Sequence, residues 1–222
     1  MNYKFDFAVL LPHWEQFAQG CWLTLRLSAV SIAVGVAVGL LAVLAKRSRS
    51  TPLRWSAQSY IEIVRNTPFL VQVLFIFFGL PSVGVSLSPN TAAVLALSLN
   101  LGAFSAEIIR TGIESVPRGQ LEAGAALGLG PFQTFRHVIL KPALRTVYPA
   151  LAGQFVMVLL TTSIVSSISA EELTSVVQNI DSNIFRSFEV YIVAALLYLA
   201  MSMILATVFK AIDRVYFSYP TK

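Results

Sequence analysis

The sequence predicts an all-α polytopic membrane protein with five transmembrane helices. Of its 222 residues, 56% are hydrophobic and 12% are charged, which is about half the charged fraction of roughly 25% in soluble domains. Uncharged apolar runs near 20 residues long recur along the chain, and Lys and Arg gather between them. Backbone polar groups within a bilayer must be satisfied inside the segment, so these runs favour helices. The composition excludes a soluble enzyme and a disordered chain.

The first predicted span covers residues 21–45, with Arg26 about one turn inside its end, where a long side chain extends back to the interface. Residues 1–20 are expected to form an N-terminal segment outside the membrane, because their apolar stretch is too short for a signal peptide. Within the span, Gly35 and Gly39 have a spacing that permits close helix contact, either between subunits or inside the chain. Three aromatic residues are expected to form an interfacial belt: Trp14, Phe17 and Trp22.

The remaining four spans follow from the charge-free runs. Residues 66–106 carry no charge but are too long for one crossing, and Pro and Gly residues interrupt them in the middle. Two helices at about 60–80 and 91–109 are therefore expected. The next uncharged runs predict spans at 146–170 and 190–209.

The distribution of basic residues predicts the orientation. With the N-terminus outside, twelve of the 16 Lys and Arg residues fall on the inner side and two on the outer side. Cytoplasmic loops carry such an excess, so residues 1–20 are expected to be extracytoplasmic, 21–214 to form the membrane domain and 215–222 to be a cytoplasmic tail. This topology accounts for the net charge of +5 without a nucleic-acid partner. Six acidic residues make the outer face net negative.

The inner connection at about 111–145 is far longer than antiparallel helices need. Pro117 and Gly128 delimit an Ala-rich stretch with the punctuation of a short helix. A second short helix is expected from Pro131 to the region of Pro142, since apolar residues fall on one face there. Two helices are therefore predicted to protrude from the inner side.

Three segments resemble a known family. Residues 105–130 read SAEIIRTGIESVPRGQLEAGAALGLG, which closely resembles the E-A-A…G loop in membrane subunits of binding-protein-dependent ABC importers. Residues 62–72, EIVRNTPFLVQ, are similar to the R-G-T-P-L-L-V-Q segment of the polar amino-acid permeases, the histidine and glutamine type. Residues 172–189 resemble the outer loop of that subfamily.

The resemblance implies a type I ABC importer-like permease subunit that carries polar amino acids across the cytoplasmic (inner) membrane by alternating access. It implies four kinds of partner: a second permease subunit, identical or homologous, two cytoplasmic ATP-binding subunits, an extracytoplasmic solute-binding protein and the lipid bilayer. ATP and Mg²⁺ would be bound by the ATPase subunits, and this chain would hold no cofactor; it contains no G-x-x-x-x-G-K-[ST] loop. The inner loop would contain the coupling helix, with coupling residues Gln120, Glu122, Ala123, Gly128 and Leu129.

The fourth span departs from the family. Where relatives commonly have K-D-T-S-L, residues 160–164 read LTTSI, so the ionisable pair that would contact a zwitterionic substrate is missing. Either neutral groups hold the substrate, or a non-identical partner subunit does, or the binding protein alone sets specificity. In the loop, Gly124 stands where the family usually has Ala, and Pro142 is displaced by one position.

Polar residues inside the spans are candidates for the translocation path, with interhelical hydrogen bonding as the alternative. These residues are Gln72, Asn100, Thr161, Thr162 and Ser163. Two pairs at spacing i, i+3 are expected to form a polar network at the inner gate: Glu62 with Arg65, and Glu107 with Arg110.

Other function classes fit less well. An ABC permease for an osmolyte or an opine-like solute remains an alternative, because the substrate pocket of a binding protein lies elsewhere. A stand-alone secondary transporter would normally have intramembrane carboxylates or repeats. An intramembrane enzyme needs a nucleophile with a base, or a metal pair, but His13 and His137 lie outside the spans and Cys21 at an edge. No catalytic or metal-binding residue is predicted.

Overall fold

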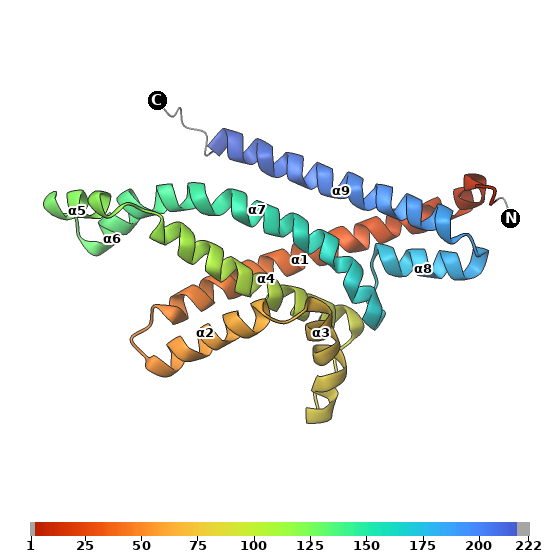
Figure 1. Ribbon diagram of the computed structural model, residues 1–222, viewed down its shortest axis with the longest axis horizontal. Coiled ribbons are helices and arrows are strands. Elements are labelled where there is room, and N and C mark those ends of the chain that lie inside the picture. Colours follow the sequence, from red (N-terminus) through yellow and green to blue (C-terminus); the bar gives the residue numbers. More distant parts are fainter. Residues whose placement is uncertain (1–2, 217–222) are drawn as a thin grey trace.

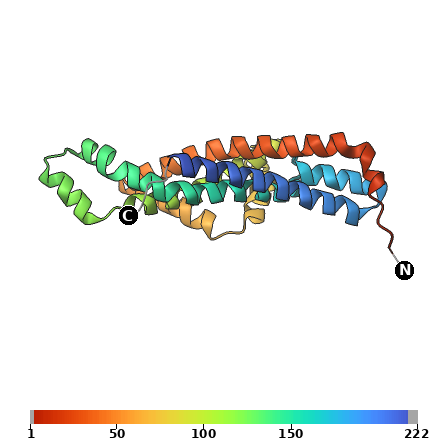
Figure 2. The same ribbon diagram turned by 90° about the horizontal axis from the view of Figure 1, so that it is seen from above.

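The computed structural model describes residues 3–216, and their regular structure is helical. A 3₁₀ turn at Phe7–His13 leads into α1 (Trp14–Lys46), α2 (Thr51–Arg65), α3 (Phe69–Leu74), α4 (Pro89–Glu114) and α5 (Arg118–Ala126). The chain continues with α6 (Pro131–Thr134), α7 (Leu140–Val165), α8 (Leu173–Ile184) and α9 (Ser187–Tyr216). Helices α1, α4, α7 and α9 run along the long axis, with α5 and α6 at one end and α8 at the other (Figures 1 and 2).

The expected multi-span architecture is confirmed, but the second span is not one helix. Helices α1, α4 and α9, together with the continuous segment Pro131–Ile168, are long and apolar enough to cross a membrane. The segments Thr51–Arg65 and Phe69–Val83, which cover the second predicted span, meet at 115°, the geometry of a broken span or of a re-entrant loop. The expected continuous helix at 60–80 is wrong because Pro68 has no N–H and disfavours helical backbone at Thr67.

The N-terminal boundary also differs. Helix α1 begins at Trp14, seven residues before the predicted span. Phe17 is 6% exposed and packs in a core with Leu173 and Val177 of α8, so it does not belong to an interfacial belt. Trp14 and Trp22 are each 64% exposed, as an interfacial residue would be.

The predicted second loop helix and the fourth span form one continuous segment, Pro131–Ile168. A π-helical turn at Phe135–Ile139 joins α6 to α7. Pro142 comes just after this π-helical turn, where the regular backbone hydrogen-bond pattern is already shifted, and the helix continues through it. This continuous helical segment therefore begins before the predicted fourth span at 146–170.

Helix α8 was not expected from the sequence. Its N-terminus is capped by Glu172, which accepts a hydrogen bond from the Ser175 N–H at 2.8 Å. Helix α9 is longer than the predicted span at 190–209 and includes residues 215 and 216 of the expected tail. The rest of that tail, residues 217–222, lies outside the described residues.

Glycines bring α1 against α4. A Cβ on Gly35 would lie 2.9 Å from Leu101, and a Cβ on Gly39 would lie 2.7 Å from Ser105. No side chain fits at either position without moving α4. The glycine spacing in α1 therefore serves packing within the chain, the second of the two interpretations that the sequence left open.

Candidate translocation cavity and coupling helix

Side chains bond backbone carbonyls at the break between α2 and α3: Asn66 Nδ2 donates to Glu62 O and Thr67 Oγ1 to Ile63 O, each at 2.8 Å. Gln72 Nε2 donates to the backbone oxygen of Val64 at 2.7 Å and to the backbone and side-chain oxygens of Thr67, each at 3.0 Å. Carbonyls at a helix end lack partners within the helix, and this amide supplies one. Gln72 Oε1 in turn accepts from Asn100 Nδ2 at 3.2 Å, which ties the break to α4.

A cavity of about 330 Å³ lies beside the break, between α2, α3, α4 and α7. Its polar wall includes Asn100, Thr161, Gln154 and Arg65, and its apolar wall includes Phe104. Small-molecule sites occupy about 300–1,000 Å³ and combine apolar walls with a few polar groups. The cavity has the size and lining of a site for a small polar solute.

A second cavity of about 360 Å³ continues toward the α5–α6 end. It shares Arg65, Phe104 and Gln154 with the first cavity and adds Glu107 and Thr111. The two cavities form a row of polar positions along the α4–α7 contact.

An ionic cluster centred on Glu107 borders this second cavity. Arg110 Nε donates to Glu107 Oε1 at 3.0 Å. Lys46 Nζ and Arg65 Nη1 each lie 3.9 Å from Glu107 Oε2. The Arg65 guanidinium also lies over the Phe104 ring, 5.5 Å from its centroid. One carboxylate therefore connects α1, α2 and α4.

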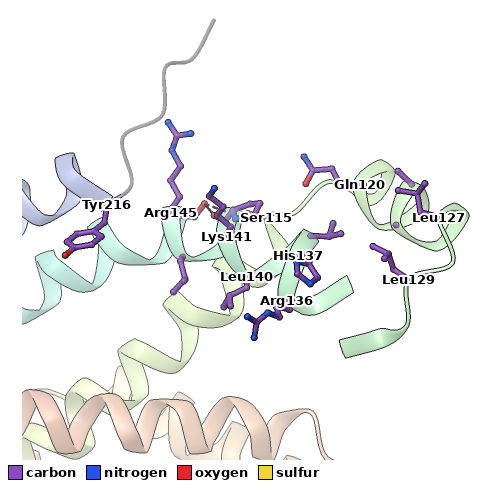
Figure 3. Close-up of a pocket in the computed structure, with 16 residues that line it drawn as sticks. Ser115, Gln120, Leu127, Leu129, Arg136, His137, Leu140, Lys141, Arg145 and Tyr216 are labelled. Carbon is purple, nitrogen blue, oxygen red and sulfur yellow. Dashed lines mark hydrogen bonds between the residues drawn. The ribbon is translucent and has the colours of Figure 1, made fainter. Parts of the chain in front are cut away.

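Helix α5 begins after Pro117 and ends before Gly128, as expected. Gly128 follows it with φ +73°, in the left-handed region that glycine adopts without strain. Glu122 is exposed on α5. Gln120, Ala123 and Leu129 instead line a groove that α5 forms with the start of α7 (Figure 3).

Residues 32–217 match the family model of the binding-protein-dependent transport system inner membrane component. The chain belongs to this family. It is a multi-pass membrane permease component, as the sequence predicted.

Related permeases cover nearly the whole chain. It is 36% identical over 213 residues to the glutamine transport system permease protein GlnP of Escherichia coli (strain K12), covering 95% of this chain and 97% of that protein. It is 36% identical over 212 residues to the octopine transport system permease protein OccM of Rhizobium meliloti, covering 90% of this chain and 86% of that one. A chain in the crystal structure of an amino acid ABC transporter with histidines superposes with a TM-score of 0.91 and 37% identity, covering 96% of this chain and 99% of that one.

In the structure of the permease, only some of the residues predicted to line the translocation path lie at the cavity. Asn100 and Thr161 line the first cavity. Thr162 is fully buried and donates to Leu159 O at 2.7 Å, and Ser163 donates to Leu160 O at 2.8 Å, so both hydroxyls bond within α7. Gln72 donates hydrogen bonds to the backbone at the break between α2 and α3.

Of the two charge pairs predicted at the inner gate, the structure forms one as expected and changes the partners of the other. Glu107 and Arg110 bond as expected, but Arg65 pairs with Glu107 across helices, and Glu62 accepts from Gln58 one turn back on α2. Gln154 was missed. It lies in the uncharged run that predicted the fourth span, so it carried the same signal as Gln72.

Proposed function

We propose that this permease subunit moves a polar amino acid through the cavity beside the α2–α3 break. The observation that carries the proposal is the lining of that cavity: the neutral groups of Asn100, Gln154 and Thr161 together with the Arg65 guanidinium. A guanidinium suits the substrate carboxylate, and amides suit its other polar groups. Asn100, Gln154 and Thr161 support the first alternative for the missing Lys–Asp pair, in which neutral groups hold the substrate, and Arg65 adds one charged group that this alternative did not include.

The chain works within a larger importer in this proposal. A second permease subunit, identical or homologous, completes the pathway, and an extracytoplasmic solute-binding protein delivers the substrate. Two cytoplasmic ATP-binding subunits hold ATP and Mg²⁺, and this chain catalyses no reaction. The basic residues at the α5–α6 end support a cytoplasmic location for that end and an extracytoplasmic N-terminus in the inner membrane.

Helix α5 is the proposed coupling helix. Its exposed carboxylate Glu122 and its small side chains Ala123, Ala125 and Ala126 suit a cleft on an ATPase subunit. Gly128 allows the sharp exit of the chain, and Gln120 and Leu129 line the groove between this helix and α7. Closure of the ATPases would then move α4 and α7, which flank the loop, and expose the cavity alternately to each side.

An opine-like solute is the second candidate substrate. The octopine permease has the same 36% identity to this chain as the glutamine permease.

Uptake measurements test the proposal. Purification in mild detergent with mass spectrometry should first identify an ATP-binding protein bound to the chain. The complex, reconstituted with its binding protein, should then show ATP-dependent uptake of at least one radiolabelled compound among glutamine, arginine, octopine and a quaternary-amine osmolyte. An amino acid is the expected substrate. Uptake driven by an ion gradient without any ATPase would contradict the proposal and favour a secondary transporter.

A further inference from the structure

The Arg65 guanidinium lies at the boundary between the two polar cavities. Arg65 is the last residue of α2, and it lines both the cavity of about 330 Å³ beside the break and the cavity of about 360 Å³ that continues toward the α5–α6 end. Glu107 lines only the second of the two. The ion pair between Arg65 and Glu107 is therefore placed where the first cavity meets the second.

Arg65 is the one charged residue among the described residues that line the first cavity. Within residues 3–216 its guanidinium makes an ion pair with Glu107 Oε2 at 3.9 Å and lies over the Phe104 ring. A separation of 3.9 Å exceeds the roughly 2.7–3.2 Å of an N–H···O hydrogen bond. The contact between Arg65 and Glu107 is therefore held by charge attraction without a hydrogen bond.

Glu107 is bound more closely by another residue. Arg110 donates to Glu107 Oε1 from Nε at 3.0 Å and also from Nη2. The other carboxylate oxygen, Oε2, is shared by Lys46 Nζ and Arg65 Nη1, each at 3.9 Å. Glu107 thus keeps two cationic partners when Arg65 moves away. A solute carboxylate that accepts two N–H groups of the guanidinium would bind Arg65 more strongly than Glu107 does.

We propose that the Arg65 guanidinium is exchanged between Glu107 and the carboxylate of the transported solute. Before the solute binds, Arg65 links the end of α2 to α4 through Glu107. The solute carboxylate then takes the guanidinium, and the ionic link at the junction of the two cavities is lost. Tyr60 Oη still donates to Leu99 O at 2.6 Å, so α2 stays attached to α4 earlier along its length.

Occupancy of the first cavity thereby loosens α2 from α4 at the junction and opens the way toward the α5–α6 end. This inference rests on the proposed function and concerns the regulation of the same site.

Calorimetric titration of glutamine into the purified permease, with its copurifying subunits and without a binding protein, tests the exchange. Glu107→Gln removes the competing charge, so glutamine should bind about fivefold more tightly, the upper value for loss of an exposed ion pair. Lys46→Gln leaves Glu107 Oε2 to Arg65, so glutamine should bind about fivefold more weakly. Arg49→Gln removes an exposed charge at the same end and should keep the wild-type affinity.

The opposite signs distinguish exchange from a purely structural role. Glu107→Gln and Lys46→Gln each remove an ionic contact from the same cluster, so a cluster that only holds helices together would change the affinity in the same direction in both. Changes of the same sign, or no change in either variant, would overturn the exchange. Melting temperatures of both variants show that the titrated protein is folded.

Glutaminamide, which lacks the α-carboxylate, provides a test on the unmodified protein. It should bind at least about fivefold more weakly than glutamine, because it offers no carboxylate to Arg65. Equal binding of the two compounds would refute the exchange and leave the proposed transport cavity in place. A wild-type protein that binds none of glutamine, arginine and octopine would instead contradict the proposed function, and the exchange with it.

Discussion

Asn100 Nδ2 donates to Gln72 Oε1 at 3.2 Å, while Gln72 Nε2 donates to the carbonyls of Val64 and Thr67. The two amides have similar chemistry and both were candidates for the path. Their surroundings give them different roles: Asn100 lines the cavity, and Gln72 bonds backbone carbonyls at the bend between α2 and α3. Substitutions at the two positions should therefore have different consequences.

Asn100→Leu should reduce uptake about tenfold or more while the amount of folded protein stays within about twofold. The variant removes an amide from the cavity lining, and a lost hydrogen bond to the solute of about 1.4 kcal/mol corresponds to a tenfold effect. Uptake rates normalised to the membrane content of the protein measure the effect. Ser98→Ala on the same helix, outside the cavity lining, is the control and should keep wild-type uptake.

Gln72→Leu should chiefly lower stability. Val64 O and Thr67 O lose their donor at the 115° bend, so the melting temperature in detergent should fall further than in Asn100→Leu. A melting temperature equal to that of the wild type would contradict the structural role given to Gln72.

Glu122→Lys should leave the protein in the membrane but abolish ATPase binding and uptake. The exposed carboxylate of α5 is replaced by a cation at the proposed docking face. Copurification of the ATP-binding subunit is the measurement. Glu171→Lys reverses an exposed charge at the opposite end and should retain that subunit. Normal uptake by Glu122→Lys would refute the coupling assignment.

Gly112→Ala should destabilise the protein by about 1–3 kcal/mol, the usual cost of overpacking. A Cβ at Gly112 would lie 2.2 Å from Val147 Cγ2 and 3.2 Å from Ala143 O, where α4 meets α7. Gly124→Ala is the contrast. Its Cβ would lie 3.4 Å from Val138 Cγ2, and the change should be neutral or stabilise by about 0.5–1 kcal/mol. Thermal unfolding in detergent distinguishes them, and Val147→Ala should partly rescue Gly112→Ala.

Glu172 should make stability depend on pH. Burial raises the pKa of the Glu172 carboxyl above its ordinary value of 4.5, although hydrogen bonds from Tyr198 and the Ser175 backbone oppose the shift. Because this pKa is higher in the folded state than in the unfolded state, protonation of Glu172 stabilises the fold. Its contribution is therefore present below about pH 4.5 and is lost as the pH rises through the raised pKa.

Thermal melting across this pH range measures the Glu172 effect. Glu172→Gln stays uncharged and keeps an acceptor for the Ser175 N–H. The melting temperature of this variant minus that of the wild type should therefore increase as the pH rises. Glu171→Gln changes an exposed neighbour and should leave the wild-type pH profile unchanged. Parallel profiles for wild type and Glu172→Gln would show that burial of this carboxyl is not linked to stability.

Some features were predictable because their signals are local. Uncharged apolar runs predicted the long helices, Pro117 and Gly128 delimited α5, and the Lys and Arg pattern separated the two ends. Helix α8 was missed because it is too short to cross a membrane, although Glu172 and Ser175 have the spacing of a capping pair. The helix breaker Pro68 was visible in the sequence, but an apolar run across it predicted a single span.

By itself, the sequence determined the helical membrane fold, the order of its spans and the family to which it belongs. Tertiary structure decided the 115° break, the burial of Glu172 and the choice of Asn100, Gln154, Thr161 and Arg65 as cavity residues. The reason is physical. Hydrophobicity and helix signals act along the chain, whereas a cavity forms where faces of several helices meet. Which faces meet depends on close contacts such as those of Gly39 with Ser105 and Gly112 with Val147.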